Sequence, residues 1–276
     1  MATPLASAHY GVIGGSGFYR FFDDAERVPV RTPFGEPSGD VVIGLVEGRR
    51  VAFLARHGED HRLPPHRVNY RANLWALRSV GVRQVISPCA VGSLRAEVGT
   101  GSIVVPDQVV DRTWGRGHTF YDEPGSVVHL EFADPYCPLG RRAVMTAAAE
   151  RGVDAVDGGT LVVINGPRFS TRAESLMHQA AGWSVVGMTA MPEAGLAREL
   201  AMCFTTVALV TDLDAGVDGG PAVTHQAVLA AFAGNVDRLK DVVARAIGAL
   251  PAPEDGETGC RCRTALDGLR LPFELP

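Results

Sequence analysis

Short apolar runs alternate with stretches of helical periodicity along most of this chain. The runs include HYGVIGG, DVVIGLVEG, RVAFLARHG, RQVISPCAVGS and GTLVVINGP, and helical patterns cover 70–79, 138–151, 171–181, 192–203 and 224–250. Strands that alternate with helices build sheets that are mainly parallel, because each crossover between parallel strands carries a helix onto one face. The pattern therefore predicts an α/β protein with a large central sheet covered by helices.

The helical pattern ends near residue 250, and the tail over 251–276 has a different character. It opens with PAPEDGETGCRCR, which is rich in proline, glycine and charge and is typical of a linker. No repeat or low-complexity tract marks a boundary before this point. We expect one domain over 1–250, with 251–276 forming a linker and a short terminal helix that pack on the same domain.

The run TTVALVTDLDAG, residues 205–216, leads into two aspartates, Asp212 and Asp214. Residues two apart in a strand point to the same side, so both carboxylates can converge on one ligand. Such a pair can hold a metal, exchange a proton or accept hydrogen bonds from a substrate. Asp and Gly are also ordinary turn residues, so the pattern alone leaves a plain turn open.

Small or polar residues follow several other apolar runs. Gly14-Gly15-Ser16-Gly17 follows YGVI, Arg56-His57-Gly58 follows RVAFLA, and further segments of this kind are CAVGS, GPRFS and GMT. Glycines let backbone amides approach an anion, and an arginine fork matches a multi-oxygen anion, to which the adjacent imidazole adds a second donor. Open α/β sheets bind ligands at the carboxyl ends of their strands, so one pocket built from several loops is the leading hypothesis.

Composition excludes several classes of protein. The formal charge of −5, without a basic run, argues against nucleic-acid binding, and the chain has neither a signal-like N-terminus nor an apolar stretch of membrane-spanning length. Five scattered cysteines fit a reducing cytoplasm better than a disulfide framework, although Cys260 and Cys262 leave a local disulfide open beside a free-thiol tail. Lys240 is the only lysine, which disfavours Schiff-base and P-loop chemistry. The histidines of HGEDH lack the spacing of a zinc helix, so we expect no metal.

The motifs GGSG, ARHG, VNYRANLWAL, AVGSL, GPRFSTRAES, MTAMPEAGLARE and TDLDAG occur in this order along the chain. Together they closely resemble the trimeric purine nucleoside phosphorylases, specifically their 5′-methylthioadenosine phosphorylase branch, from about residue 11 to 250. The resemblance implies one α/β domain with a mixed, partly barrel-like sheet, a homotrimer, and phosphorolysis of a purine nucleoside. It also implies inorganic phosphate as co-substrate and no cofactor.

The resemblance assigns roles to individual positions. It places phosphate at Ser16, Arg56, His57, Thr189 and the amide of Ala90, the ribose at Met188, and the purine at Phe169 and Ser170. Cys89 stands where relatives often carry threonine, so this phosphate contact is weaker here, since a thiol is a poor donor.

A carboxylate beside the 6-position of a purine accepts from the amino group of adenine and repels the oxo group of hypoxanthine. Asp212 and Asp214 are therefore interpreted as adenine selectors, and the 6-oxopurine branch carries asparagine at the first position. Asp212 also serves as the general acid toward N7, provided that burial and Asp214 raise its pKa.

The pocket for the 5′ group is expected to contain His129, His225 and Val228, with His129 reaching across a subunit boundary. Many methylthioadenosine phosphorylases carry a small apolar residue at the position of His225, whereas a histidine there binds a 5′-hydroxyl in the 6-oxopurine enzymes. The sequence thus predicts a cytoplasmic phosphorylase of 5′-methylthioadenosine. The alternatives are a phosphorylase of adenosine or inosine, a nucleosidase that uses water, and a nucleoside-binding protein without activity.

Overall fold

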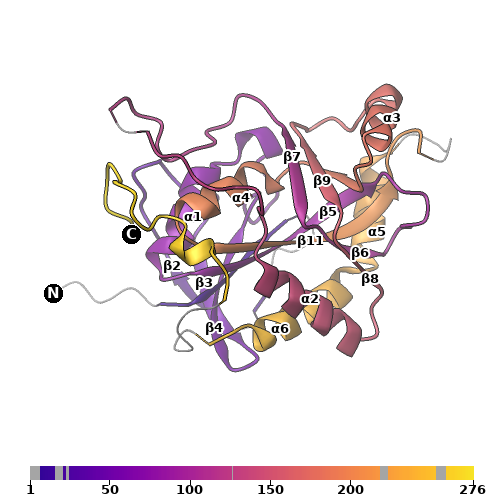
Figure 1. The fold of residues 1–276 in the computed structure, drawn as a ribbon. Helices are drawn as coiled ribbons and strands as arrows, with labels where there is room; N and C mark the ends of the chain where they lie inside the picture. Colours follow the sequence, from indigo (N-terminus) through magenta and orange to yellow (C-terminus); the bar gives the residue numbers. More distant parts are fainter. Residues whose placement is uncertain (1–6, 16–20, 23–24, 126, 218–222, 253–258) are drawn as a thin grey trace.

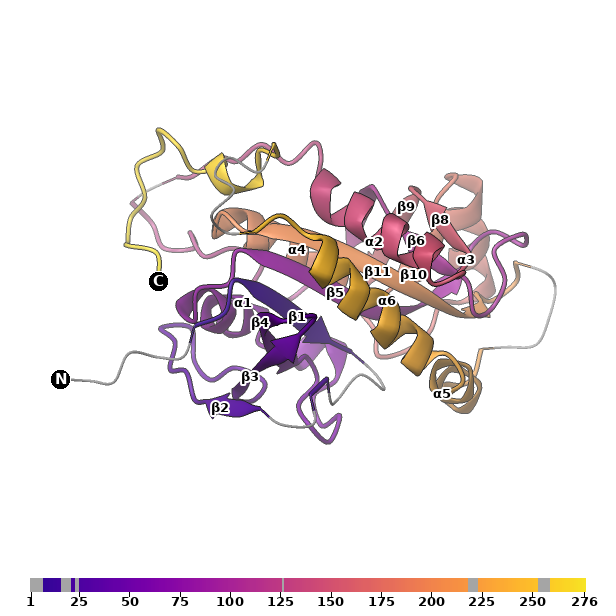
Figure 2. The ribbon, with the colours of Figure 1, turned by 90° about the horizontal axis from the view of Figure 1, so that it is seen from below.

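A computed structural model describes residues 7–15, 21–22, 25–125, 127–217, 223–252 and 259–276. Within these residues the chain builds one mixed sheet of eleven strands with helices on both faces (Figures 1 and 2). The strands are β1 (Tyr10–Gly14), β2 (Glu26–Val28), β3 (Val41–Val46), β4 (Arg49–Ala55), β5 (Gln84–Ser93), β6 (Ile103–Val105), β7 (Gln108–Arg112), β8 (Ala155–Asp157), β9 (Thr160–Ile164), β10 (Val185–Gly187) and β11 (Cys203–Leu213). The helices are α1 (Tyr70–Ser79), α2 (Pro138–Glu150), α3 (Arg172–Ala180), α4 (Ala190–Glu199), α5 (His225–Ala233) and α6 (Val236–Ala249), with single 3₁₀ turns η1 (Pro65–Arg67) and η2 (Cys262–Thr264).

The long strand β5 organises the sheet. Along one edge it pairs in parallel with β11 over its whole length, and along the other it pairs first with β1 and then, antiparallel, with β10. The sheet therefore divides beside β5 into a branch through β1, β4, β3 and β2 and a branch through β10, β9 and β7. This division confirms the mixed sheet implied by the resemblance. Within the described residues, six of the ten strand pairs are parallel, so the sheet is mainly parallel as expected, and four pairs that involve β2, β3, β6 and β10 are antiparallel.

Alternation along the strands separates two apolar layers. Val12, Phe53 and Ile86 pack beneath α2 and α6, while their neighbours Ile13, Leu54 and Val85 pack beneath α1 and α4. Figure 2 shows α2 and α6 side by side over the sheet. Successive strand residues point to opposite faces, so a strand covered by helices on both sides is apolar at most positions, as β1 is, with all five residues buried.

Two expected helices have different bounds. The single helix predicted over 224–250 is divided into α5 and α6, because Gly234 ends the first helix and Asn235 precedes the second with a non-helical ψ of −5° and φ of −127°. The helix predicted over 192–203 is α4, which begins earlier, and the chain is already extended at Cys203.

Within residues 251–252 and 259–276 of the tail, the one regular element is the short η2 turn. Phe273 and Leu275 follow it and pack against the core cluster that includes Trp75. Arg78 also donates a hydrogen bond of 2.6 Å to the carbonyl of Pro276. None of the helices in the described part of the chain is long and apolar enough to cross a membrane.

Candidate active site

A cavity of about 340 Å³ opens where the carboxyl ends of β1, β4, β10 and β11 meet the last residues of β5. Strand ends supply most of its lining, and α5 closes one side (Figure 1). The residues predicted from the sequence that line it are Arg56, His57, Cys89, Ala90, Phe169, Ser170, Met188, Thr189, Asp212, Asp214, His225 and Val228. Ser16 lies outside the described residues, although the preceding Gly15 lines the cavity.

Arg56 lies at the base of the cavity with its guanidinium held in place. Its Nε and Nη2 donate to the two carboxylate oxygens of Glu193 at 2.5 and 3.0 Å, and Nη2 also donates to Ser87 Oγ at 2.6 Å. Nη1 faces the loop after β1, because a Cβ atom added to Gly15 would lie 2.6 Å from it. Nη1 thus packs closely against Gly15, and because both residues line the cavity, the buried cation can attract an anion bound in the cavity beside this loop.

The imidazole of His57 is neutral. Burial, and after it the adjacent Arg56 cation, lowers the pKa of His57 to about 3. Nδ1 lies 2.8 Å from the carbonyl oxygen of Leu63, and because a carbonyl only accepts, Nδ1 carries the ring proton. Nε2 is therefore an acceptor, which differs from the side-chain donor expected from the sequence. This nitrogen can bind a ligand group that donates a hydrogen bond, such as a hydroxyl.

The two aspartates lie beside each other at the end of β11, where the pairing with β5 is irregular between Val210 and Asp212. Asp214 is buried and accepts a short hydrogen bond from Ser175 Oγ, while Asp212 accepts one of 2.9 Å from Thr211 Oγ1. Burial, with a smaller contribution from the charge of Asp214, raises the pKa of Asp212 to about 6. This carboxyl group can therefore exchange a proton near neutral pH.

Space for these carboxylates depends on Gly92 of β5. A Cβ atom at this position would lie 2.9 Å from Asp212 Oδ1 and 3.2 Å from Asp214 Cβ. Any larger residue would displace the pair, so the glycine of CAVGS has a packing role beside the acids.

The wall beside the aspartates is suited to a flat heteroaromatic ring. Phe169 and Ile164 provide apolar surface there, and Val186 and Met188 line the same cavity. Ser170 is buried, and its Oγ has no hydrogen-bond partner among the described residues. A buried hydroxyl without a partner is costly, so this atom is available to a ligand that brings a polar edge.

The other end of the cavity is formed by α5 and by the loop that carries His61. His225 is the first residue of α5 and is exposed, and the helix is capped by Thr224, whose Oγ1 accepts from the amide of Ala227 at 3.2 Å. His225 is thus neither the cap nor a core residue. Leu229, one turn along, is 42% exposed, so this side of the cavity is apolar and open.

His129 is exposed and does not line the cavity. The resemblance assigns His129 to the site of a neighbouring subunit, and within its own chain it does not contribute to the cavity.

Sequence reasoning missed three residues of this site. Glu193 accepts a hydrogen bond from Arg56, and Ser175 donates one to Asp214. The ring of His61 lies tilted against that of His57, with the ring centroids 4.4 Å apart. Glu193 and Ser175 lie inside the motifs MTAMPEAGLARE and GPRFSTRAES, but nothing in those letters distinguishes a buried carboxylate or hydroxyl from an exposed one. The histidines of HGEDH form no candidate metal cluster within the described ranges.

The chain is similar to known proteins over most of its length. The model of the Phosphorylase superfamily matches residues 9–248. A purine nucleoside phosphorylase from Streptomyces coelicolor is 59% identical over 276 residues, covering 98% of each chain. An S-methyl-5′-thioadenosine phosphorylase from Mycolicibacterium smegmatis is 55% identical, covering 96% of this chain and 99% of the relative.

The fold agrees as well. The solved methylthioadenosine phosphorylase from Schistosoma mansoni in complex with adenine superposes with a TM-score of 0.84 at 37% identity, covering 87% of this chain and 91% of that one. The chain therefore belongs to the phosphorylase superfamily, in the family of purine nucleoside and S-methyl-5′-thioadenosine phosphorylases.

Proposed function

We propose that this protein catalyses the phosphorolysis of S-methyl-5′-thioadenosine to adenine and 5-methylthioribose 1-phosphate. The observation that carries the proposal is the pair Asp212 and Asp214 in the same cavity as Ser170, whose hydroxyl has no hydrogen-bond partner among the described residues. Two carboxylates accept hydrogen bonds from the 6-amino group of adenine and repel a 6-oxo group, so the pair favours an aminopurine. Relatives that are named for the same reaction support it.

Phosphate is proposed to bind at the end of the cavity away from the purine, near Gly15 and Arg56. The buried cation neutralises part of its charge, and Thr189, which is 7% exposed, contributes a hydroxyl. The neutral His57 accepts from a P–OH group, so monohydrogen phosphate satisfies both a donor and an acceptor here. Cys89 adds little, because burial raises the pKa of its thiol to about 12 and leaves it a weak neutral donor.

The proposed reaction breaks the C1′–N9 bond and forms a bond between C1′ and a phosphate oxygen. As the glycosidic bond lengthens, positive charge develops on the ribosyl group and its electron pair moves into the purine. The protonated form of Asp212 delivers a proton to N7, which neutralises the leaving base. Phosphate held by Arg56 lies ready on the other face of the sugar, and the reaction needs no resident metal or organic cofactor.

A second substrate class is supported by His225 and by the purine nucleoside phosphorylase among the similar proteins. An imidazole at the 5′ end can bind the hydroxyl group of adenosine or inosine, whereas Val228 and Leu229 suit a methylthio group. The test is release of free base from methylthioadenosine, adenosine and inosine, each with and without phosphate. Phosphate-dependent release fastest from methylthioadenosine supports the proposal. Fastest release from inosine would refute the role of the aspartates, and release without phosphate would indicate a nucleosidase.

The variant His225→Val is expected to raise the ratio of kcat/KM for methylthioadenosine over adenosine by about 10-fold, since an apolar wall accepts sulfur and leaves a hydroxyl unpaired. Steady-state kinetics with both nucleosides measures the ratio. His66→Val is the matched control, because His66 is exposed and does not line the cavity. An unchanged ratio in His225→Val would remove this residue from the 5′ pocket.

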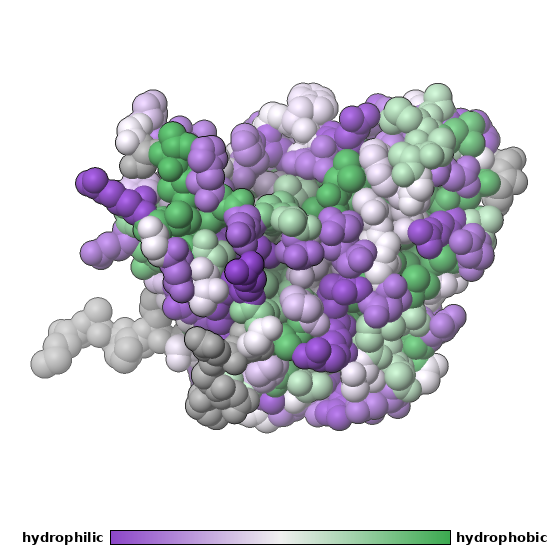
Figure 3. Space-filling model, in the orientation of Figure 1, coloured by the Kyte–Doolittle hydropathy of each residue, from purple (hydrophilic) through white to green (hydrophobic). Residues whose placement is uncertain are grey.

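We further propose that the protein acts as a homotrimer in the cytoplasm, with His129 reaching a neighbouring site. Support comes from apolar surface next to the cavity: Trp114, Leu176 and Met177 are 74, 49 and 46% exposed, and Ile164 lines both the cavity and the hollow beside Trp114 and Met177. Figure 3 shows apolar side chains at the surface in the region of α3, which carries Leu176 and Met177. Contiguous apolar surface of this kind marks contacts between proteins.

Light scattering is expected to give three times the chain mass of 29.3 kDa. Met177→Arg should dissociate the assembly and lower activity, and a monomeric wild-type protein with full activity would contradict the trimer.

A further inference from the structure

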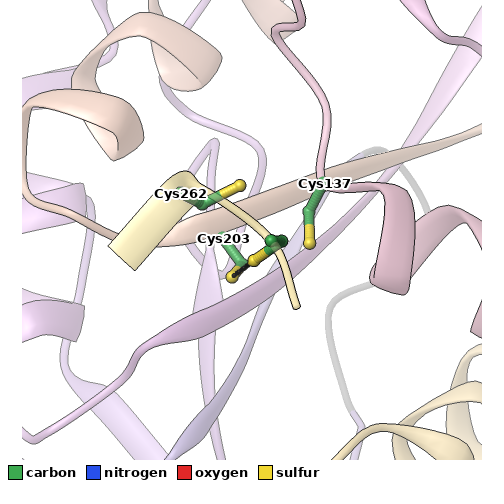
Figure 4. Close-up of side chains that lie close together, drawn as sticks. Cys137, Cys203 and Cys262 are labelled. Carbon is green, nitrogen blue, oxygen red and sulfur yellow. Dashed lines mark hydrogen bonds between the residues drawn. The ribbon is translucent and has the colours of Figure 1, made fainter. Parts of the chain in front are cut away.

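Four of the five cysteines converge on one point far from the cavity. Figure 4 shows that Cys137 at the start of α2, Cys203 on β11 and Cys262 on the C-terminal turn lie close together. The Sγ atoms of these three and of Cys260 all lie within 4.8 Å of each other, and those of Cys203 and Cys260 are 3.5 Å apart. Cysteines that are scattered along the sequence are thus brought together by the fold, and none of them forms a disulfide, in agreement with the expectation for Cys260 and Cys262.

The spacing matches a closed tetrahedral metal site. A zinc ion with Zn–S distances of about 2.3 Å holds its four sulfurs roughly 3.8 Å apart. The Sγ atoms of Cys203 and Cys260, 3.5 Å apart, lie near that value, and no separation within the cluster exceeds 4.8 Å. None of the four cysteines forms a disulfide, so each offers one ligand atom. Four sulfur ligands leave no open position, which is the arrangement of a structural zinc site and not of a catalytic one.

The burial of these four side chains is more typical of metal ligands than of reactive thiols at the surface. Cys137 and Cys203 are fully buried and Cys262 is 4% exposed, with only Cys260 half-buried. The backbone around them is already fixed, because the amide of Cys137 donates to the carbonyl of Phe204 at 2.8 Å and the amide of Cys203 donates to that of Arg83 at 2.8 Å. Two ligands thus come from the rigid core and two from the tail, so a shared ion would connect them.

We propose that Cys137, Cys203, Cys260 and Cys262 bind one Zn²⁺ ion that fastens the C-terminal tail to the start of β11 and to α2. Binding replaces four S–H bonds by four Zn–S bonds and releases four protons, with no change in oxidation state. Arg261 and Arg263, which alternate with the tail cysteines, offset part of the negative charge of the tetrathiolate complex.

Metal analysis of the full-length protein tests this site directly. Protein purified without chelator is expected to contain one zinc per chain by inductively coupled plasma mass spectrometry. The denatured protein should show five free thiols after the zinc is chelated, without reductant. Replacement of the zinc by Co²⁺ should give thiolate-to-metal charge-transfer absorption.

Cysteine variants test which residues bind the zinc ion. Cys260→Ser/Cys262→Ser should lose the zinc and lower the melting temperature, whereas Cys89→Ser, which changes the one cysteine outside the cluster, should keep one zinc per chain. Two outcomes would overturn the proposal. One is a mass lower by two hydrogens for each disulfide, with no metal. The other is four reactive thiols that still bind no Zn²⁺ or Co²⁺ when either ion is added to the reduced protein.

Discussion

Asp212→Asn is expected to lower kcat/KM for methylthioadenosine and adenosine by about 10²- to 10⁴-fold, and to raise activity toward inosine relative to both. The amide cannot deliver a proton to N7, and its NH₂ group faces the 6-amino group of adenine with a donor where an acceptor is required. The same NH₂ group can donate to the 6-oxo group of hypoxanthine. Steady-state kinetics with the three nucleosides at saturating phosphate measures the change.

The matched control is Asp154→Asn, which alters an exposed carboxylate that does not line the cavity. Its kinetics should equal those of the wild-type enzyme. If Asp212→Asn kept its turnover of adenine nucleosides, neither proton delivery nor selection of the 6-amino group would belong to this residue.

Asp212→Asn is expected to raise stability although it lowers activity, and this combination distinguishes a functional residue from a structural one. Burial raises the pKa of Asp212 from 3.8 to about 6, so between these values the native protein binds more protons than the unfolded chain. The free energy of unfolding contributed by this group therefore falls as pH rises from about 4 to 6, and above that range the ionised carboxylate costs about 3 kcal/mol. Asp212→Asn should be more stable than wild type at pH about 8, with a smaller difference near pH 4. Urea unfolding at both pH values, without ligand, tests the sign.

The features that sequence predicts here are local ones. Strands were found because apolar runs such as TTVALV are buried on both sides, and the i, i+2 spacing of Asp212 and Asp214 holds although the pairing of β11 is irregular between Val210 and Asp212. The strand ends were predicted to meet because parallel strands place their carboxyl ends at one edge. The resemblance then assigned a ligand to each end.

The features that sequence does not predict depend on contacts between distant segments. β10 runs antiparallel to β5, and no local pattern encodes that direction. The tautomer of His57 is set by the carbonyl of Leu63 in a loop whose path is not evident from its residues. Cys137 and Cys262 come together because the C-terminal tail returns to the core. Sequence composition does not predict a contact between residues so far apart in the chain.

Glu193→Ala is expected to destabilise the protein by about 3–5 kcal/mol, because it leaves the cation of Arg56 buried without its partner. Both side chains are almost fully buried, at 1 and 0% exposure. The contrasting control is Glu59→Ala, since the ion pair of Glu59 with Arg27 is exposed at 56 and 58% and should change stability by less than about 1 kcal/mol. Urea unfolding of the two variants gives the comparison, and equal effects would mean that burial does not strengthen the inner pair.

The double variant Arg56→Met/Glu193→Leu separates folding from catalysis. Apolar residues of similar volume often replace a buried ion pair without loss of stability, so the double variant should be more stable than Glu193→Ala. It should nevertheless lack phosphorolysis, because the guanidinium that faces Gly15 is gone. Glu193→Gln, which keeps the acceptor but loosens the guanidinium, should fold and lose on the order of 10²-fold in kcat/KM for phosphate, with a smaller change in the KM for the nucleoside. Equal losses for both substrates would show that Glu193 supports the whole cavity and does not specifically position Arg56.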